Sequence, residues 1–113
     1  AFHALTGVGL TGQWRAPGGR TTQQSLRWAA SCGYPVHVQW SDSGYVGDDW
    51  PSDKHSNQAL LERALKQIAA GDIVLMHLGV WSRKEPLAPI LKPLIQGLKA
   101  RNLCFATLAG PQR

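Results

Sequence analysis

Short apolar segments of the kind found in buried strands alternate along this chain with amphipathic helical segments. Apolar side chains alternate over 36–40, form a continuous run over 73–76 and recur over 103–108. Helical spacing of apolar residues lies between them, over 23–31, 57–68 and 87–98. Strands that alternate with helices pair in parallel through right-handed crossovers. The order therefore predicts an α/β fold, either a small doubly wound sheet or part of a β/α barrel.

The predicted helices are bounded by residues that start and stop helices. The first two helices are preceded by side chains that can cap a helix, Thr21 or Thr22 and Ser56 or Asn57. All three are followed by a residue that tolerates a left-handed backbone: Gly33, Gly71 and Asn102. Pro93 should kink or restart the third helix, because proline has no N–H to donate. A short strand at 13–15 and the end of a helix at 1–6 complete the pattern. We expect one partial domain over 1–113.

The composition of the chain further restricts the kind of protein that it can be. The chain has 113 residues, 43% hydrophobic and 17% charged, a balance typical of one folded domain. No apolar run approaches the ~20 residues of a membrane span. The net charge is +5 but the basic residues are scattered, so we expect no nucleic-acid partner. Cys32 and Cys104 lack the spacing of a metal or redox motif; we expect buried free thiols, with one long-range disulfide left open.

Polar residues follow three of the predicted strands, where parallel sheets build their sites. Arg15 ends the first strand, an acidic loop containing Trp50 follows the second, and His77 ends the third. Together they form a candidate polar site with an aromatic wall, in which His77 is a general acid or base. The alternative is a solvated surface, with Trp50 covering the core. The four histidines are too far apart for a metal motif.

Three motifs in this order resemble the polysaccharide deacetylases of the NodB-homology type, carbohydrate esterase family 4. Arg-Ala-Pro-Gly-Gly (15–19) is similar to the family's Arg-Pro-Pro-Tyr-Gly motif, Asp-Asp-Trp (48–50) to its Asp-Trp motif, and Gly-Asp-Ile-Val-Leu-Met-His (71–77) to its Leu-x-His motif. Residues 95–108 resemble the family's last helix and strand. The resemblance covers the C-terminal half of that domain. It implies half of a distorted (β/α) barrel, with about four parallel strands alternating with three to four helices.

The resemblance also implies an activity, the metal-dependent hydrolytic deacetylation of an N-acetylated or O-acetylated polysaccharide. His77 would be the general acid that protonates the leaving amine. Arg15 would pair with the carboxylate that acts as the base. Asp49, or else Asp42, would take the Asp-Trp position, and Asp49 is the candidate that orients His77. The residues implied in substrate binding are Trp50, Asp49, Leu75, Pro17 and Gly18.

The family's divalent metal, zinc or a cobalt-like ion, is held by one aspartate and two histidines from motifs that are absent here. We therefore expect no metal ligands in this chain and little activity from it alone. A second chain carrying the N-terminal half of the domain would complete the site. Four strands of an open barrel would also leave two sheet edges exposed, which predicts a tight partner or a swapped dimer. Proteins that contain the complete domain of this family are usually exported to the periplasm or outside the cell, and the resemblance implies the same location here. The alternatives are a non-catalytic carbohydrate-binding half-domain and, more remotely, an anion-binding domain.

Overall fold

The computed structural model describes residues 2–77 and 79–108, and of Phe2 only the backbone. These residues form two compact units. The first runs up to Gln39 and takes in Thr107 and Leu108, and the second is Trp40–Ala106. The sequence predicts one partial domain over 1–113, whereas compactness divides the chain in two.

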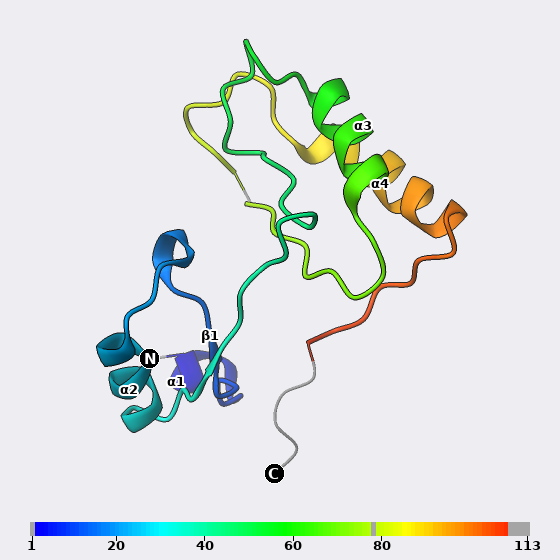
Figure 1. The fold of residues 1–113 in the computed structure, drawn as a ribbon. Coiled ribbons are helices and arrows are strands. Elements are labelled where there is room, and N and C mark those ends of the chain that lie inside the picture. Colours follow the sequence, from blue (N-terminus) through cyan, green and yellow to red (C-terminus); the bar gives the residue numbers. More distant parts are fainter. Residues whose placement is uncertain (1, 78, 109–113) are drawn as a thin grey trace. The chain divides into compact units, whose positions relative to one another are not determined.

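The first unit is built around a parallel pair of very short strands. Its elements are α1 (Phe2–Thr6), β1 (Gln13–Trp14), the 3₁₀ turn η1 (Pro17–Gly19), α2 (Gln23–Ser31) and β2 (Val36–His37) (Figure 1). Gln13 pairs with Val36 and Trp14 with His37. The strands expected at 13–15 and 36–40 are therefore confirmed, although each is shorter than predicted. Val38 N–H extends the pairing by donating to Trp14 O over 2.8 Å.

Helix α2 has the ends predicted for it but no buried face. The Thr22 hydroxyl accepts from Ser25 N–H, and the Ser25 hydroxyl oxygen accepts from Thr22 N–H, the reciprocal arrangement of a capping box. Gly33, at φ 90°, follows the C-terminus. None of the helix's residues is buried. Among the residues described in this unit, Ala16 is the one buried apolar side chain.

The second unit has a small apolar core between two helices, α3 (Asn57–Gln67) and α4 (Ala88–Ala100), which lie side by side (Figure 1). The core is Ala64 and Ile68 against Leu94 and Leu98. Full burial of a leucine or isoleucine side chain contributes roughly 1.5–3 kcal/mol. The predicted apolar stripes are confirmed, except that Ile95 is 42% exposed. The buried residues of α4 recur every four positions: Ile90, Leu94 and Leu98. Ile95 comes directly after Leu94 and therefore lies about 100° further round the helix, away from the buried side.

The helix boundaries in this unit follow from local chemistry. Ser56 caps α3 by accepting a hydrogen bond from Ala59 N–H. Asn102, at φ 61°, takes the left-handed position after α4. Pro93 lies inside α4, which continues through it. The hydrogen bond that Pro93 cannot donate would go to a carbonyl in the first turn of the helix, so its loss costs little continuity.

The continuous apolar run at 73–76 forms an extended segment with one parallel bridge, between Tyr45 and Leu75. Leu75 N–H donates to Gly44 O over 3.0 Å, and Leu75 O accepts from Val46 N–H over 3.4 Å. The predicted strand is reduced to this bridge because its partner segment turns sharply, with Gly44 N–H donating to Ser41 O. The two segments nevertheless run parallel, as the α/β pattern requires.

Two expectations about the rest of the chain are wrong. Residues 103–108 form no strand, because the described part of the chain provides no neighbouring strand with which they pair. Cys32 and Cys104 are free but exposed rather than buried. Cys32 caps a helix that has no buried face, and Cys104 lies in the unpaired segment after α4. The half-barrel stays a prediction, and no helix in 2–77 or 79–108 has the length and apolar character needed to cross a bilayer.

Candidate functional site

A buried carboxylate holds His77 at two points. Asp48 is 1% exposed, and its Oδ2 accepts from the His77 backbone N–H over 2.6 Å. Its Oδ1 lies 3.0 Å from His77 Nδ1. Because an ionised carboxylate only accepts hydrogen bonds, Nδ1 is the donor of this contact, and Nε2 is left for another partner. The imidazole itself is 40% exposed, so one edge of a fixed ring faces outward.

Local backbone geometry brings these two residues together. The parallel contacts of Gly44 and Val46 with Leu75 bring the ends of the two segments to the same place, and His77 follows one of them. Gly47, at φ 82°, turns the other segment immediately before Asp48. A Cβ on Gly47 would also lie 2.8 Å from the ring of Trp50, so glycine is required there for space as well.

The acidic residue that orients His77 is Asp48, one position before the predicted Asp49. The turn at Gly47 directs the side chain of Asp48 inward and leaves Asp49 exposed. Asp49 instead accepts a hydrogen bond from the Tyr45 hydroxyl. Burial, followed by this hydrogen bond and the charge of Asp49, raises the pKa of Tyr45 well above its ordinary value. Asp42, the other candidate for the motif, has an exposed side chain.

Trp50 packs within a group of aromatic and cationic side chains. Its ring lies edge-on to Tyr45, with centroids 5.7 Å apart, and 4.7 Å from the ring of His55. The guanidinium carbon of Arg63 lies 4.9 Å from the Trp50 ring centroid, within the range of a cation–π contact. Trp50 is half-buried and does not line the cavity beside His77. Its observed contacts favour the interpretation in which it covers the protein interior.

A cavity of about 740 Å³ lies beside the Asp48–His77 pair. This volume is within the range of pockets that hold small organic ligands. Val74 and Met76 line it, whereas Leu75 between them is 4% exposed and does not. Successive side chains of an extended segment point to opposite sides, which accounts for the difference. The other lining residues come from one loop and the start of α4: Gly79, Val80, Trp81, Arg83, Glu85, Pro86, Leu87, Ala88 and Leu91.

Arg83 is a residue of this site that sequence patterns did not identify. Its side chain is 3% exposed and donates to three oxygens: Trp50 O at 2.6 Å, His55 O at 2.8 Å and Asn57 Oδ1 at 2.9 Å. In the sequence it stands in a polar stretch, Ser-Arg-Lys-Glu-Pro, that indicates only a solvated loop. No local signal distinguishes it from the neighbouring Lys84.

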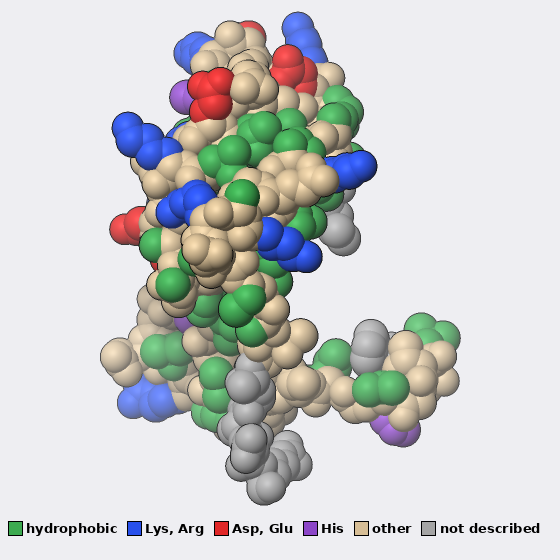
Figure 2. Space-filling model, turned by 90° about the vertical axis from the view of Figure 1, so that its right-hand side faces the viewer, with side chains coloured by type: hydrophobic (Ala, Val, Ile, Leu, Met, Phe, Trp, Pro, Cys, Tyr) green, Lys and Arg blue, Asp and Glu red, His purple; other side chains and the backbone are tan. Residues whose placement is uncertain are grey.

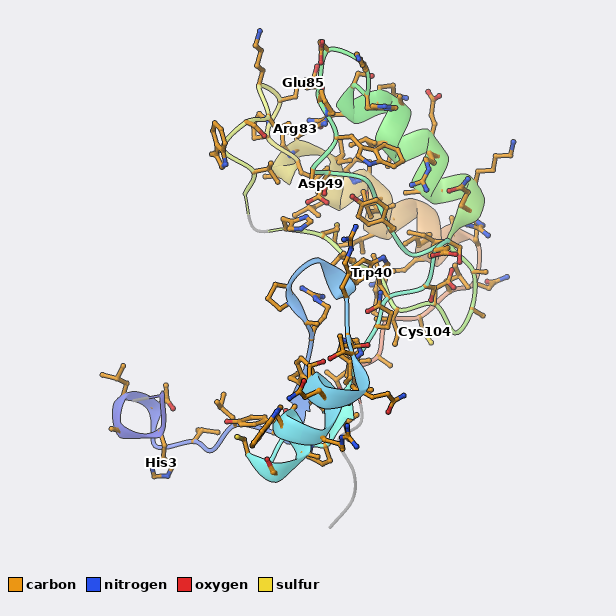
Figure 3. The ribbon with its side chains drawn as sticks, turned by 60° about the vertical axis from the view of Figure 1, so that its left-hand side comes forward. His3, Trp40, Asp49, Arg83, Glu85 and Cys104 are labelled. Atoms are coloured by element: carbon orange, nitrogen blue, oxygen red, sulfur yellow. The ribbon has the colours of Figure 1, made fainter. Side chains whose placement is uncertain are left out.

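Glu85 completes the attachment of this loop to α3. Its Oε2 accepts from the backbone N–H of Asn57, the first residue of the helix, over 2.6 Å, and lies 3.8 Å from the Arg83 guanidinium. The Asn57 side-chain amide donates to Pro86 O over 2.7 Å. A carboxylate at a helix N-terminus is favoured by the unpaired N–H groups there. Figure 3 shows Arg83 and Glu85 close together on the loop.

Arg15, Pro17 and Gly18 lie in the first unit, in and beside η1. All three are exposed, and Gly18 has φ 63°. The motif is fixed at Ala16, whose N–H donates to His37 Nε2 over 3.2 Å. The two units are not placed relative to each other, so a shared site for Arg15 and His77 stays a prediction.

The described parts of the chain contain no group of three or more His, Cys, Asp or Glu side chains that could hold a metal ion. The Asp48–His77 pair therefore does not by itself fit a metal, and we assign no step to one in this chain. Lys and Arg side chains are dispersed on the face shown in Figure 2 and form no single basic patch there. Comparison of the chain with protein-family models, curated proteins and solved structures finds no match.

Proposed function

We propose that this chain supplies the general acid of a polysaccharide deacetylase-like hydrolase, as the C-terminal half of a distorted (β/α) barrel. The observation that carries the proposal is the Asp48–His77 pair at the wall of a 740 Å³ cavity. A histidine whose ring is fixed by a buried carboxylate, with one nitrogen free toward a cavity, suits proton transfer to a substrate. The motif resemblance supplies the substrate class, an N-acetylated or O-acetylated polysaccharide.

The role of each group follows from its hydrogen bonds. Asp48 holds Nδ1–H, so a protonated His77 presents its Nε2–H outward. In hydrolysis, the base takes one proton from a water molecule and the water oxygen bonds to the acetyl carbon. The carbon–nitrogen bond then breaks, and the second water proton is lost to solvent as the acid product ionises. The departing nitrogen takes the proton from Nε2 and leaves as an amine, and acetate is the other product. The two contacts with Asp48 keep the ring oriented while the proton moves.

The remaining parts of the reaction are proposed on the resemblance alone. Arg15 pairs with the carboxylate that serves as the base, and Pro17 and Gly18 border the substrate. The base and the divalent metal, zinc or cobalt-like, come from a second chain that carries the N-terminal half of the domain. A non-catalytic carbohydrate-binding half-domain is the second candidate, and the aromatic side chain of Trp81 in the cavity lining favours it.

The test is acetate release from N-acetylglucosamine oligomers with added zinc or cobalt. Intact-mass spectrometry records every polypeptide in each preparation. We expect release only where a second, different polypeptide is present. His77→Ala should then reduce the rate by about 100-fold or more, the usual contribution of a general acid.

Matched variants separate the two neighbouring aspartates. Asp48→Asn keeps the side-chain shape but removes the charged acceptor, and should slow acetate release by about tenfold or more. Asp49→Asn shows whether the neighbouring position, which the resemblance implies in substrate binding, also contributes. Asp53→Asn is the control, because Asp53 is exposed and does not line the cavity, and it should leave the rate within twofold. Equal rates in wild type and His77→Ala would refute the proposed role. Oligomer binding without release, in preparations of every composition, would favour the carbohydrate-binding alternative.

A further inference from the structure

Trp81 is 99% exposed, the extreme among the large apolar side chains described in this chain. It also lines the cavity that contains the Asp48–His77 pair. Its exposure has a simple local cause. Arg83 N–H donates to Val80 O over 3.0 Å, which closes a four-residue turn with Trp81 in its second position. A side chain at the tip of such a turn projects away from the backbone on either side.

The turn that carries Trp81 is firmly attached on its C-terminal side. Arg83, the last residue of the turn, is buried and makes its three hydrogen bonds to the segment 50–57. Lys84 N–H donates to the Ser52 hydroxyl over 3.2 Å, and Glu85 binds the start of α3. The backbone on the C-terminal side of Trp81 is therefore already held in place, so a ligand that contacts the indole does not have to order it on binding.

The exposed ring needs a ligand with a flat apolar face. The three tryptophans that are half-buried, Trp14, Trp40 and Trp50, all have ring contacts within the protein. At Trp81 the indole face is free, while the same cavity offers the carboxylate and imidazole of Asp48 and His77. A pyranose ring has a face of C–H groups and an edge of hydroxyl or acetamido groups. It matches this combination of an aromatic plane and hydrogen-bonding groups in one cavity.

We propose that Trp81 is a stacking platform for a sugar ring next to the one whose acetamido group meets His77. This inference rests on the proposed function and specifies its substrate: an oligosaccharide that occupies at least two positions, rather than a single acetylated sugar. Trp81 is a specificity-determining residue on this view. It contacts the ligand without taking part in proton transfer.

The experiment measures the affinity of the chain for N-acetylglucosamine and for its tetramer, by isothermal titration calorimetry. Trp81→Ala should weaken tetramer binding by at least about fivefold, because the apolar contact between the indole face and the second sugar ring is lost. Trp81→Tyr should restore most of the affinity. Trp28→Ala is the matched control, because Trp28 is 64% exposed on α2 of the other unit. It should bind the tetramer as wild type does.

Four outcomes decide the inference. Selective loss of tetramer affinity in Trp81→Ala, with unchanged far-ultraviolet circular dichroism, supports it. Equal tetramer affinity in wild type and Trp81→Ala overturns it, as does wild-type protein that binds no oligomer. Binding of a dodecyl chain in preference to the tetramer would also overturn it and assign the cavity to acyl groups. The proposed function is read separately, from acetate release in His77→Ala, so failure of the inference is distinguishable from failure of the proposed function.

Discussion

Adjacent side chains in this protein have opposite environments. Asp48 is buried and makes two contacts with His77, whereas Asp49 is exposed and accepts from Tyr45. The two carboxylates are chemically identical, and a single backbone torsion at Gly47 separates their roles. The consequence for function is that the charge nearest the imidazole is shielded from solvent, where its interaction with the ring is screened least.

Tyr45 gives a prediction at the same scale. Its pKa is raised in the folded chain, so the unfolded chain loses this proton first, from about pH 10 upward. The folded state then binds more protons than the unfolded state, and stability falls as pH rises through that range. The slope should be a fraction of the ~1.4 kcal/mol per pH unit of a fully shifted group, because the side chain is only half-buried.

Urea unfolding of wild type and Tyr45→Phe between pH 8 and pH 11 measures this slope. Phenylalanine removes the titrating hydroxyl, so the difference in free energy of unfolding between the two proteins should shrink above pH 10. Tyr34→Phe is the control, since Tyr34 is the other of the two tyrosines. Parallel pH profiles for wild type and Tyr45→Phe would contradict the assignment.

At the scale of elements, the pairing of 41–46 with 73–75 depends on Gly44. A Cβ on Gly44 would lie 2.3 Å from Ile73 O and 2.9 Å from its carbonyl carbon, both backbone atoms that cannot rotate away. Gly44→Ala should therefore separate the two segments and destabilise the fold by about 2 kcal/mol. The same separation would move Asp48 away from His77.

The measurement is urea unfolding, together with the nitrogen-15 shift of the His77 backbone amide, which reports its hydrogen bond to Asp48. Gly79→Ala is the control, because a Cβ there would meet nothing within 4 Å. It should change stability by no more than about 0.5 kcal/mol. A Gly44→Ala protein with wild-type stability and an unmoved His77 amide would show that the segments pair differently.

The sequence predicts some elements better than others. The difference depends on how far apart in the sequence the residues that stabilise each element lie. The three long helices were predictable because their caps and apolar stripes lie within a few residues, as at Thr22 and Ser56. A strand needs a partner from elsewhere in the chain, which a local pattern does not show. The apolar pattern of 103–108 predicts a strand, but the segment forms no strand in the structure. The site followed the same rule. His77 could be predicted from its place after an apolar run, but Arg83 depends on contacts with residues some 26–33 positions away.

The whole molecule combines one unit that has a core with one that has almost none. Among the residues described, every buried apolar side chain except Ala16 belongs to the second unit. Helix α2 has well-formed ends but no buried residue, and it exposes Trp28. An isolated helix of nine residues is marginal in water, because tertiary packing supplies most helix stability. The described residues of the first unit therefore lack the contacts that would keep it folded independently.

Hydrogen exchange followed by mass spectrometry tests this difference in stability. Amides of α3 and α4 should exchange only through the main unfolding of the second unit, whereas those of α2 should exchange at least about tenfold faster. Running the exchange at two protein concentrations makes the result informative about partners. If α2 becomes protected as concentration rises, its exposed face is covered by a second copy, as the proposed swapped dimer requires. Equal protection of α2 and α3 at every concentration would contradict the prediction, because a unit without a core would then be as stable as the unit that has one.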